Sequence, residues 1–140
     1  MIIAAYTVIE HQDRFLLTKD KGKNGWKIPG GKIEPDEHLL SGSLREIKEE
    51  TNLEIIHTGL ISIQQYNSKS GESRIRFYFL GQIKSGSASA LNEVEKIHWI
   101  SKLDSSNLQV SDFFLPTYYQ AIQKYLNNQI FPLSIFDQTT

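Results

Sequence analysis

The chain has 140 residues, of which 39% are hydrophobic and 22% charged, so it can form one hydrophobic core, and we expect a single domain over residues 1–140. The 15 Lys and Arg residues against 16 Asp and Glu leave a net charge of −1, which disfavours duplex nucleic acid as a main partner. The lack of cysteine excludes disulfides, thiolate metal sites and thiol nucleophiles.

Nothing in the sequence suggests a membrane or secretory segment. No apolar run approaches the ~20 residues that span a bilayer. The apolar opening stretch has no basic region and reaches Glu10 too soon for a signal peptide. We therefore expect a cytoplasmic protein without membrane association.

The first part of the chain predicts a hairpin followed by a glycine-rich turn. Segments 2–9 and 14–19 are rich in β-forming residues and are separated by the polar residues 10–13. A loop over 20–25 follows. The segment 26–32 then predicts a short strand that is ended by a proline and two glycines.

A helix is predicted over 37–51. Asp36 stands where a capping side chain is expected, and Asn52 stands where a left-handed residue ends a helix. An apolar stripe recurs at helical spacing at Leu40, Leu44, Ile47 and Thr51.

The second half of the chain predicts strands and a final helix. Strands are expected over 54–66, 74–83 and 96–100, and a helix over 115–127, with Ser111 or Asp112 near its start and Pro116 in its first turn. The apolar tail 131–136 is expected to pack back on the domain or to form an interface. A mixed β-sheet with one early and one C-terminal helix is an α+β or α/β layered arrangement.

Three glutamates, Glu46, Glu49 and Glu50, fall on one side of the predicted helix. A solvated helix face is the simplest interpretation of such a set. However, Glu46 and Glu50 are like charges at i,i+4, unfavourable by roughly 0.2–0.5 kcal/mol. Two of the three also lie in the last turn, where the helix dipole disfavours anions. A divalent cation would compensate both effects, and oxygen ligands favour Mg²⁺, with Mn²⁺ as a substitute.

The residues around these glutamates support a site. Gly30 and Gly31 follow Pro29 and would let the backbone approach a ligand closely, leaving a carbonyl as a further hard ligand. The alternative is an ordinary strand-to-helix turn. Arg45 could orient a glutamate or contact a phosphate, or could be a surface arginine in an ion pair.

This segment resembles the Nudix box, in which a glycine, a glutamate and the run Arg-Glu-aliphatic-x-Glu-Glu-x-Gly-aliphatic occur at fixed spacing. Gly31, Glu37, Arg45–Ile47, Glu49–Glu50 and Leu53 match in register, and the preceding WKIPG also resembles the family's approach to the box. The chain departs from the pattern at Asn52, where the family has glycine, and at Gly42, where a small residue such as alanine is usual. Neither change removes a charged position.

The resemblance implies an α/β/α layered Nudix fold and a Mg²⁺-dependent hydrolase of a nucleoside diphosphate linked to another group. By position, it implies metal ligation by Glu46, Glu49, Glu50 and the Gly30 carbonyl, with Glu37 and Arg45 ordering the glutamates. Relatives often use a further glutamate from a later loop as ligand or base. Glu93 and Glu95 are the candidates, and spacing favours Glu93, although either could be an ordinary loop residue. Glu50 or this loop glutamate would accept a proton from the attacking water.

The remaining phosphates need positive charge, and the strand 74–83 supplies it. Alternation puts Arg74, Arg76 and Tyr78 on one face of that strand. These arginines, with Lys19 or Lys23 near the glycine turn, are candidate phosphate ligands or else exposed basic residues. Trp26, Tyr66 and Tyr78 could stack on a base, or could belong to the core.

The substrate class stays open between several alternatives. Segments RIRFYF and YYQAIQKYLNNQIFPLSIF resemble a subgroup of small, MutT-like Nudix phosphatases that act on nucleoside di- and triphosphates and thiamine-type pyrophosphates. Dinucleoside polyphosphate or ADP-ribose-type hydrolysis is an alternative, and a non-catalytic nucleotide-sensing module is another. The partner is expected to be a small nucleotide or organic pyrophosphate, and the chain a monomer or a homodimer.

Overall fold

A mixed β-sheet forms the centre of the molecule in the computed structural model, which describes residues 1–137. The strands are β1 (Ile2–His11), β2 (Arg14–Asp20), β3 (Gly30–Lys32), β4 (Glu54–Asn67), β5 (Ser73–Ser85) and β6 (Val94–Ser101). The sheet order is β4-β5-β1-β2-β6, and β3 also pairs with β1. β1 and β5 run parallel, whereas the other pairs are antiparallel. The predicted mixed sheet, including the β1–β2 hairpin, is confirmed.

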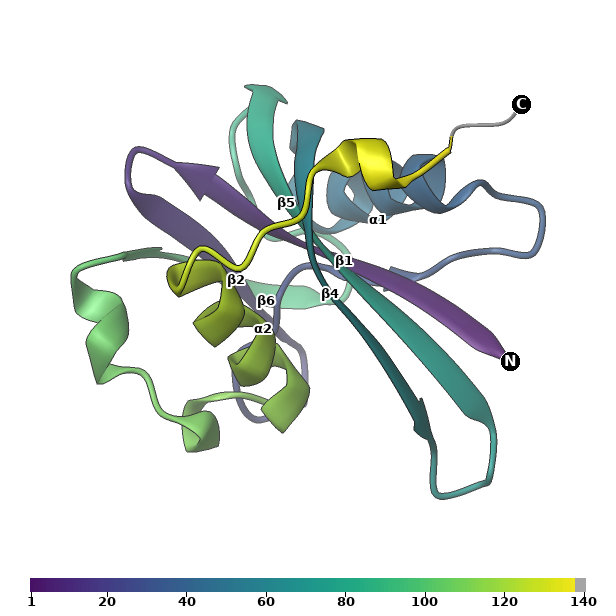
Figure 1. The fold of residues 1–140 in the computed structure, drawn as a ribbon. Helices are drawn as coiled ribbons and strands as arrows, with labels where there is room; N and C mark the ends of the chain where they lie inside the picture. The colour runs from purple at the N-terminus through teal and green to yellow at the C-terminus, as the bar shows by residue number, and fades with distance from the viewer. Residues whose placement is uncertain (138–140) are drawn as a thin grey trace.

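Two helices cover opposite faces of this sheet, α1 (Leu39–Thr51) and α2 (Pro116–Leu126), as Figure 1 shows. The alternation of β1 explains the two layers. Tyr6 and Val8 belong to the apolar cluster that contains Ile122 of α2, whereas Ile9 packs in a second cluster with Ile47 of α1. This is the α/β/α arrangement that the resemblance implies.

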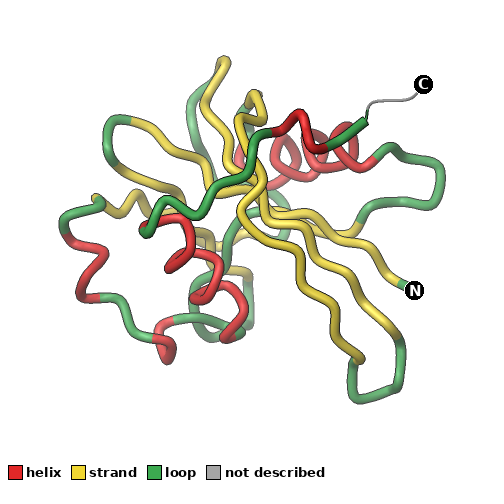
Figure 2. The backbone as a smooth tube through the Cα atoms, viewed as in Figure 1, coloured by secondary structure: helices red, strands yellow, loops and turns green. Residues whose placement is uncertain are grey.

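Short 3₁₀ segments and the C-terminal tail complete the described part of the chain: η1 (Asp104–Asn107), η2 (Val110–Asp112) and η3 (Leu133–Ile135) (Figure 2). Leu133 and Phe136 pack against the cluster that contains Phe79, so the tail covers the α1 face of the sheet. Within residues 1–137, none of the helices combines the length and apolar character needed to cross a membrane.

The expected strand before Pro29 is wrong. Trp26 and Lys27 make only isolated bridges, to Phe113 and Thr18, and the short strand lies after the proline at Gly30–Lys32. The position of the short strand at these glycines has a steric reason. A Cβ on Gly30 would lie 2.1 Å from the Ala5 carbonyl oxygen, and its φ of +146° is one that other residues rarely adopt. Only glycine lets β3 lie this close to β1.

The predicted start and cap of the first helix are also corrected. The helix begins at Leu39, and its N-cap is His38, whose side chain makes no capping hydrogen bond, so Asp36 does not cap it. Glu37 is held before the helix by its contact with Arg45. At the other end, Asn52 adopts the predicted left-handed conformation with φ 65°. Of the predicted stripe, Ile47 and Thr51 are buried, but Leu44 is 39% exposed.

The residues predicted near the start of the second helix do not cap it either. Pro116 lies in the first turn of α2 as expected, and Leu115 is the N-cap. Asp112 instead closes the separate 3₁₀ turn η2, where its carboxylate accepts a hydrogen bond from the Gln109 backbone N–H at 2.7 Å. Ser111 lies in the same turn, so neither residue caps α2.

Candidate active site

A polar cavity of about 570 Å³ lies where β1, β3, β5 and α1 meet. Its size is within the range of small-molecule sites. Acidic residues line it, namely Asp20, Glu46, Glu50 and Glu93. Basic residues also line it, among them Arg74 and Arg76 of β5, Lys32 of β3 and Lys27, which lies between Asp20 and Glu50. Both charge types face the same space.

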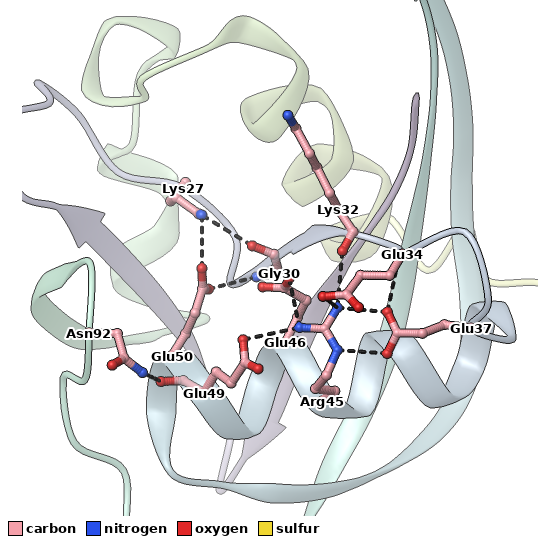
Figure 3. Close-up of polar contacts among 10 residues, drawn as sticks. All are labelled: Lys27, Gly30, Lys32, Glu34, Glu37, Arg45, Glu46, Glu49, Glu50 and Asn92. Carbon is pink, nitrogen blue, oxygen red and sulfur yellow. Dashed lines mark hydrogen bonds and ion pairs between the residues drawn. The ribbon is translucent and has the colours of Figure 1, made fainter. Parts of the chain in front are cut away.

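Glu50 is the most buried of the three helix glutamates, with only 6% of its surface exposed. The Gly30 backbone N–H donates to Glu50 Oε1 at 2.9 Å, and the Lys27 ammonium donates to Oε2 at 3.3 Å (Figure 3). Burial outweighs these contacts and raises the pKa of Glu50 to about 7. This carboxylate can therefore exchange a proton near neutral pH.

Lys27 lies in the candidate site, and sequence reasoning missed it. It is 9% exposed, and its ammonium lies 3.4 Å from Asp20 Oδ2, 3.2 Å from the Gly30 carbonyl oxygen and 3.3 Å from Glu50 Oε2. Although burial opposes its charge, Glu50 and Asp20 raise the pKa of Lys27 above its ordinary value. No local pattern in the sequence signals this burial, because the three partners come from β2, β3 and α1.

Arg45 contacts the other glutamates of the site, Glu37, Glu46 and Glu49. Its Nε and Nη2 donate to the two oxygens of Glu37 at 2.6 and 2.7 Å. Its Nη1 donates to Glu46 Oε1 at 3.2 Å and to Glu49 Oε2 at 3.1 Å (Figure 3). Nη2 also reaches the Lys32 carbonyl oxygen at 3.2 Å. The bidentate contact with Arg45 lowers the pKa of Glu37 to about 2, so this carboxylate stays ionised.

The glycine turn fits closely against the glutamates. A Cβ on Gly31 would lie 2.5 Å from Glu46 Oε2. The backbone of β3 therefore lies against the Glu46 carboxylate, and it presents the Gly30 carbonyl beside Glu50. The glycines thus allow a close approach of the backbone to Glu46, whereas the expected approach to a ligand stays a prediction.

These donors fit a hard divalent cation. Among residues 1–137, no three acidic or histidine side chains are grouped closely enough to hold a metal ion by themselves. However, the Gly30 carbonyl oxygen and Glu50 Oε2 converge on one positive charge, the Lys27 ammonium, at 3.2 and 3.3 Å. Glu46 lines the same cavity, and all of these donors are oxygens of the kind that Mg²⁺ prefers.

The loop before β6 brings Glu93 and not Glu95 to the site. Glu93 lines the cavity and also a neighbouring hollow of about 420 Å³ with Glu46, Glu49 and Glu50. Its backbone carbonyl accepts a hydrogen bond from the Lys21 N–H at 2.9 Å, which ties this loop to the end of β2. Glu95 is exposed and is not among the residues that line either space.

The predicted substrate-binding residues divide into two groups. Arg74, Arg76, Lys23 and Tyr66 line the cavity, whereas Lys19, Trp26 and Tyr78 do not. Lys19 lies opposite Lys96 in the β2–β6 pair, and the Trp26 ring is stacked on His98 with centroids 5.7 Å apart. Tyr78 is 1% exposed and its hydroxyl is hydrogen bonded to Thr117, so it is part of the core beneath α2.

Comparison with known proteins agrees with this geometry. Residues 2–116 match the model of the NUDIX domain, and the chain therefore belongs to the Nudix family of hydrolases. The Nudix hydrolase YvcI of Bacillus subtilis is 28% identical over 108 residues, covering 74% of this chain and 68% of YvcI. The phosphatase NudJ of Escherichia coli K12 is 25% identical over 132 residues, covering 91% and 85%. A solved Nudix hydrolase of Nitrosomonas europaea has a TM-score of 0.83 and 26% identity, covering 99% of this chain and 97% of that one.

Proposed function

We propose that the protein is a Mg²⁺-dependent hydrolase of a phosphoanhydride bond in a nucleoside di- or triphosphate or a related small organic pyrophosphate. One observation carries the proposal: oxygen donors of Gly30, Glu46 and Glu50 share a single cavity with the positive side chains of Arg74 and Arg76. A phosphate chain needs both a cation held by hard oxygens and direct positive charge. The similarity to a protein named phosphatase NudJ supports hydrolysis at a phosphate group.

Each residue of the site has a proposed role. Gly30, Glu46, Glu49 and Glu50 would hold Mg²⁺, with Glu93 as a further ligand, and Mn²⁺ could replace it. When bound, the ion would neutralise charge on the phosphate oxygens and acidify an attacking water. Arg45 holds Glu46 and Glu49 in position and is itself fixed by Glu37.

The proton from the attacking water needs a carboxylate acceptor. Glu50 suits this role because its carboxylate is buried at the cavity wall, where its Oε2 lies beside the Gly30 carbonyl. Glu93 is the alternative acceptor, since it lines the same cavity and is more exposed.

A phosphate-release screen with Mg²⁺ tests the proposal. The substrates are nucleoside tri- and diphosphates, thiamine pyrophosphate, ADP-ribose and dinucleoside polyphosphates, each with and without inorganic pyrophosphatase. Turnover that stops in EDTA and returns with excess Mg²⁺ is expected. Glu50→Gln should lower the rate at least a hundredfold, whereas Glu95→Gln, outside the cavity, should leave it unchanged.

Two results would contradict the proposal. Turnover that continues in EDTA would exclude the metal-dependent mechanism. Absence of turnover on the whole panel, together with nucleotide binding, would favour a nucleotide-sensing module.

A further inference from the structure

The Lys27 ammonium is shared among oxygens of three different elements. It lies 3.2 Å from the Gly30 carbonyl oxygen of β3 and 3.3 Å from Glu50 Oε2 of α1, the two contacts that Figure 3 shows. The third contact is Asp20 Oδ2 at the end of β2, at 3.4 Å. A charged hydrogen bond is typically about 2.7–2.9 Å long, so no single oxygen holds this ammonium tightly.

Two of these three oxygens are also proposed ligands of the divalent cation, namely those of Gly30 and Glu50. Mg²⁺ binds oxygen ligands directly, at about 2.0–2.1 Å. Two cations on the same pair of oxygens would repel each other strongly, because this part of the protein is buried and poorly screened. The ammonium and the metal ion therefore cannot contact both oxygens at the same time.

Asp20 offers the ammonium an alternative position away from the proposed ligands. This carboxylate is 8% exposed and already contacts Lys27 through Oδ2. Its Oδ1 is buried and has no hydrogen-bond partner in the described part of the chain, which is unfavourable for a charged group. A shift of the flexible lysine side chain toward Asp20 would bring the ammonium within reach of both carboxylate oxygens. This acceptor is used from inside the protein and needs no access from the cavity.

Lys32 shows that a lysine in this cavity need not contact the acidic residues. It lines the same cavity as Lys27, but its ammonium points away from the glutamates of α1 (Figure 3). It makes no ion pair in the part of the chain that the structure describes. Lys32 therefore carries the same charge as Lys27 without its contacts.

We propose that Lys27 and Asp20 are a pair of positioning residues that sets the affinity of the site for its divalent cation. Lys27 competes with the cation for the Gly30 carbonyl and Glu50, and Asp20 takes over the ammonium when the cation binds. The proposal rests on the proposed function for the identity of these two ligands. The required movement of the lysine lowers the apparent cation affinity, as any conformational step that must accompany binding does.

Titration with Mn²⁺ tests the pair without substrate or turnover, because the electron paramagnetic resonance signal of the free ion measures its binding. We expect Lys27→Met to bind Mn²⁺ about tenfold more tightly than wild type, since no ammonium competes for the oxygens. Asp20→Asn should bind Mn²⁺ about threefold more weakly, since the displaced ammonium loses its carboxylate. Lys32→Met is the matched control, and the loss of its more distant charge should tighten binding less than about twofold.

A double variant separates competition from the total charge of the site. Lys27→Met combined with Asp20→Asn removes one positive and one negative charge, and it leaves no buried carboxylate of Asp20 without a partner. Competition predicts Mn²⁺ binding about threefold tighter than in wild type, whereas charge alone predicts the wild-type affinity. Near-UV circular dichroism checks the fold of each variant.

NMR of the wild-type protein follows the lysine directly. With ¹³C-labelled lysine, the Lys27 side-chain signals sense the Tyr6 ring, whose centre lies 5.8 Å from the ammonium. Saturating Mg²⁺ should shift these signals, because the side chain moves toward Asp20. The signals of Lys96, which is exposed on β6, should stay unchanged.

Failure of this proposal can be distinguished from failure of the proposed function. Equal or weaker Mn²⁺ binding in a folded Lys27→Met variant overturns the competition, even if Mg²⁺-dependent hydrolysis is found. The same conclusion follows if Lys32→Met tightens binding as much as Lys27→Met, if the double variant has the wild-type affinity, or if saturating Mg²⁺ leaves the Lys27 signals unchanged. Tighter Mn²⁺ binding in Lys27→Met and in the double variant, in a protein without any turnover, supports the pair and contradicts the proposed hydrolysis alone.

Discussion

The Lys27 ammonium lies 3.3 Å from Glu50 Oε2, and the carbonyl oxygen of Gly30 approaches the same ammonium at 3.2 Å. Asp20 contributes a third oxygen at 3.4 Å. One lysine therefore compensates the negative charge of two buried carboxylates, those of Asp20 and Glu50. A divalent ion held by Glu50 and Gly30 would share this space with Lys27, which links metal binding to the position of the lysine.

Replacing Lys27 with methionine should destabilise the metal-free protein. Asp20 and Glu50 would keep their burial but lose their positive partner, which costs about 3 kcal/mol for a buried ion pair. Urea unfolding at neutral pH in EDTA measures the loss. Lys96→Met is the control, because Lys96 is exposed on β6 and should change the free energy of unfolding by less than about 0.5 kcal/mol. Equal stability of Lys27→Met and wild type would show that the ammonium does not compensate these carboxylates.

The helix carrying the glutamates could be predicted because its signals are local. The spacing of Glu46, Glu49 and Glu50 and the left-handed residue Asn52 follow from helix geometry, and the structure has the helix and its end as expected. The start was missed because Glu37, which looks helical in sequence, is held outside the helix by Arg45. That contact joins residues eight positions apart, beyond the reach of a capping rule.

How deeply a side chain is buried was harder to predict than the side of the strand on which it lies. Alternation correctly put Arg76 and Tyr78 on the same side of β5, as their shared contacts with Tyr6 and Tyr118 show. It could not indicate that Tyr78 lies under α2 whereas Arg76 borders the cavity, because α2 comes from a distant part of the chain. The burial of Lys27 was missed because its partners Asp20 and Glu50 also come from distant parts of the chain.

Adding a methyl group at Gly31 should disturb the site but not the fold. The new Cβ would lie 2.5 Å from Glu46 Oε2, and the φ of Gly31 is not in the left-handed region that other residues avoid. Glu46 must therefore move, while the backbone can stay. We expect Gly31→Ala to lower kcat/KM for the Mg²⁺-dependent reaction about 10–100-fold, the range seen when metal-site neighbours are changed. Thermal unfolding checks the fold, and wild-type activity in this variant would show that the contact with Glu46 is not needed.

Arg45 should not be replaceable by lysine. Its planar fork binds both oxygens of Glu37 at 2.6 and 2.7 Å while Nη1 reaches Glu46 and Glu49. A single ammonium cannot make these contacts together. Arg45→Lys should therefore lose at least tenfold in kcat/KM, close to the loss in Arg45→Ala. Arg14→Lys, at an exposed position, serves as the control, and an Arg45→Lys variant with nearly full activity would mean that charge alone is required.

His57 of β4 should make the stability of the fold depend on pH below neutrality. Its Nε2 is hydrogen bonded to Ser43 Oγ at 2.9 Å, its ring packs on Phe79 with centroids 4.9 Å apart, and burial lowers its pKa to about 4. The unfolded chain takes up this proton near pH 6.5, before the folded protein does. The stability contributed by neutral His57 is therefore fully present above about pH 6.5 and is lost as pH falls towards 4.

The expected loss from this histidine is about 2 kcal/mol between pH 7 and pH 5. Urea unfolding at a series of pH values measures it in wild type and in His57→Gln, which keeps a hydrogen-bonding side chain without a titration in this range. The difference between the two proteins should shrink or reverse as the pH falls, because only wild type loses this contribution. His11→Gln, at an exposed position on β1, should keep the wild-type pH dependence. A His57→Gln protein whose stability falls with pH as steeply as that of wild type would assign the acid sensitivity to other groups.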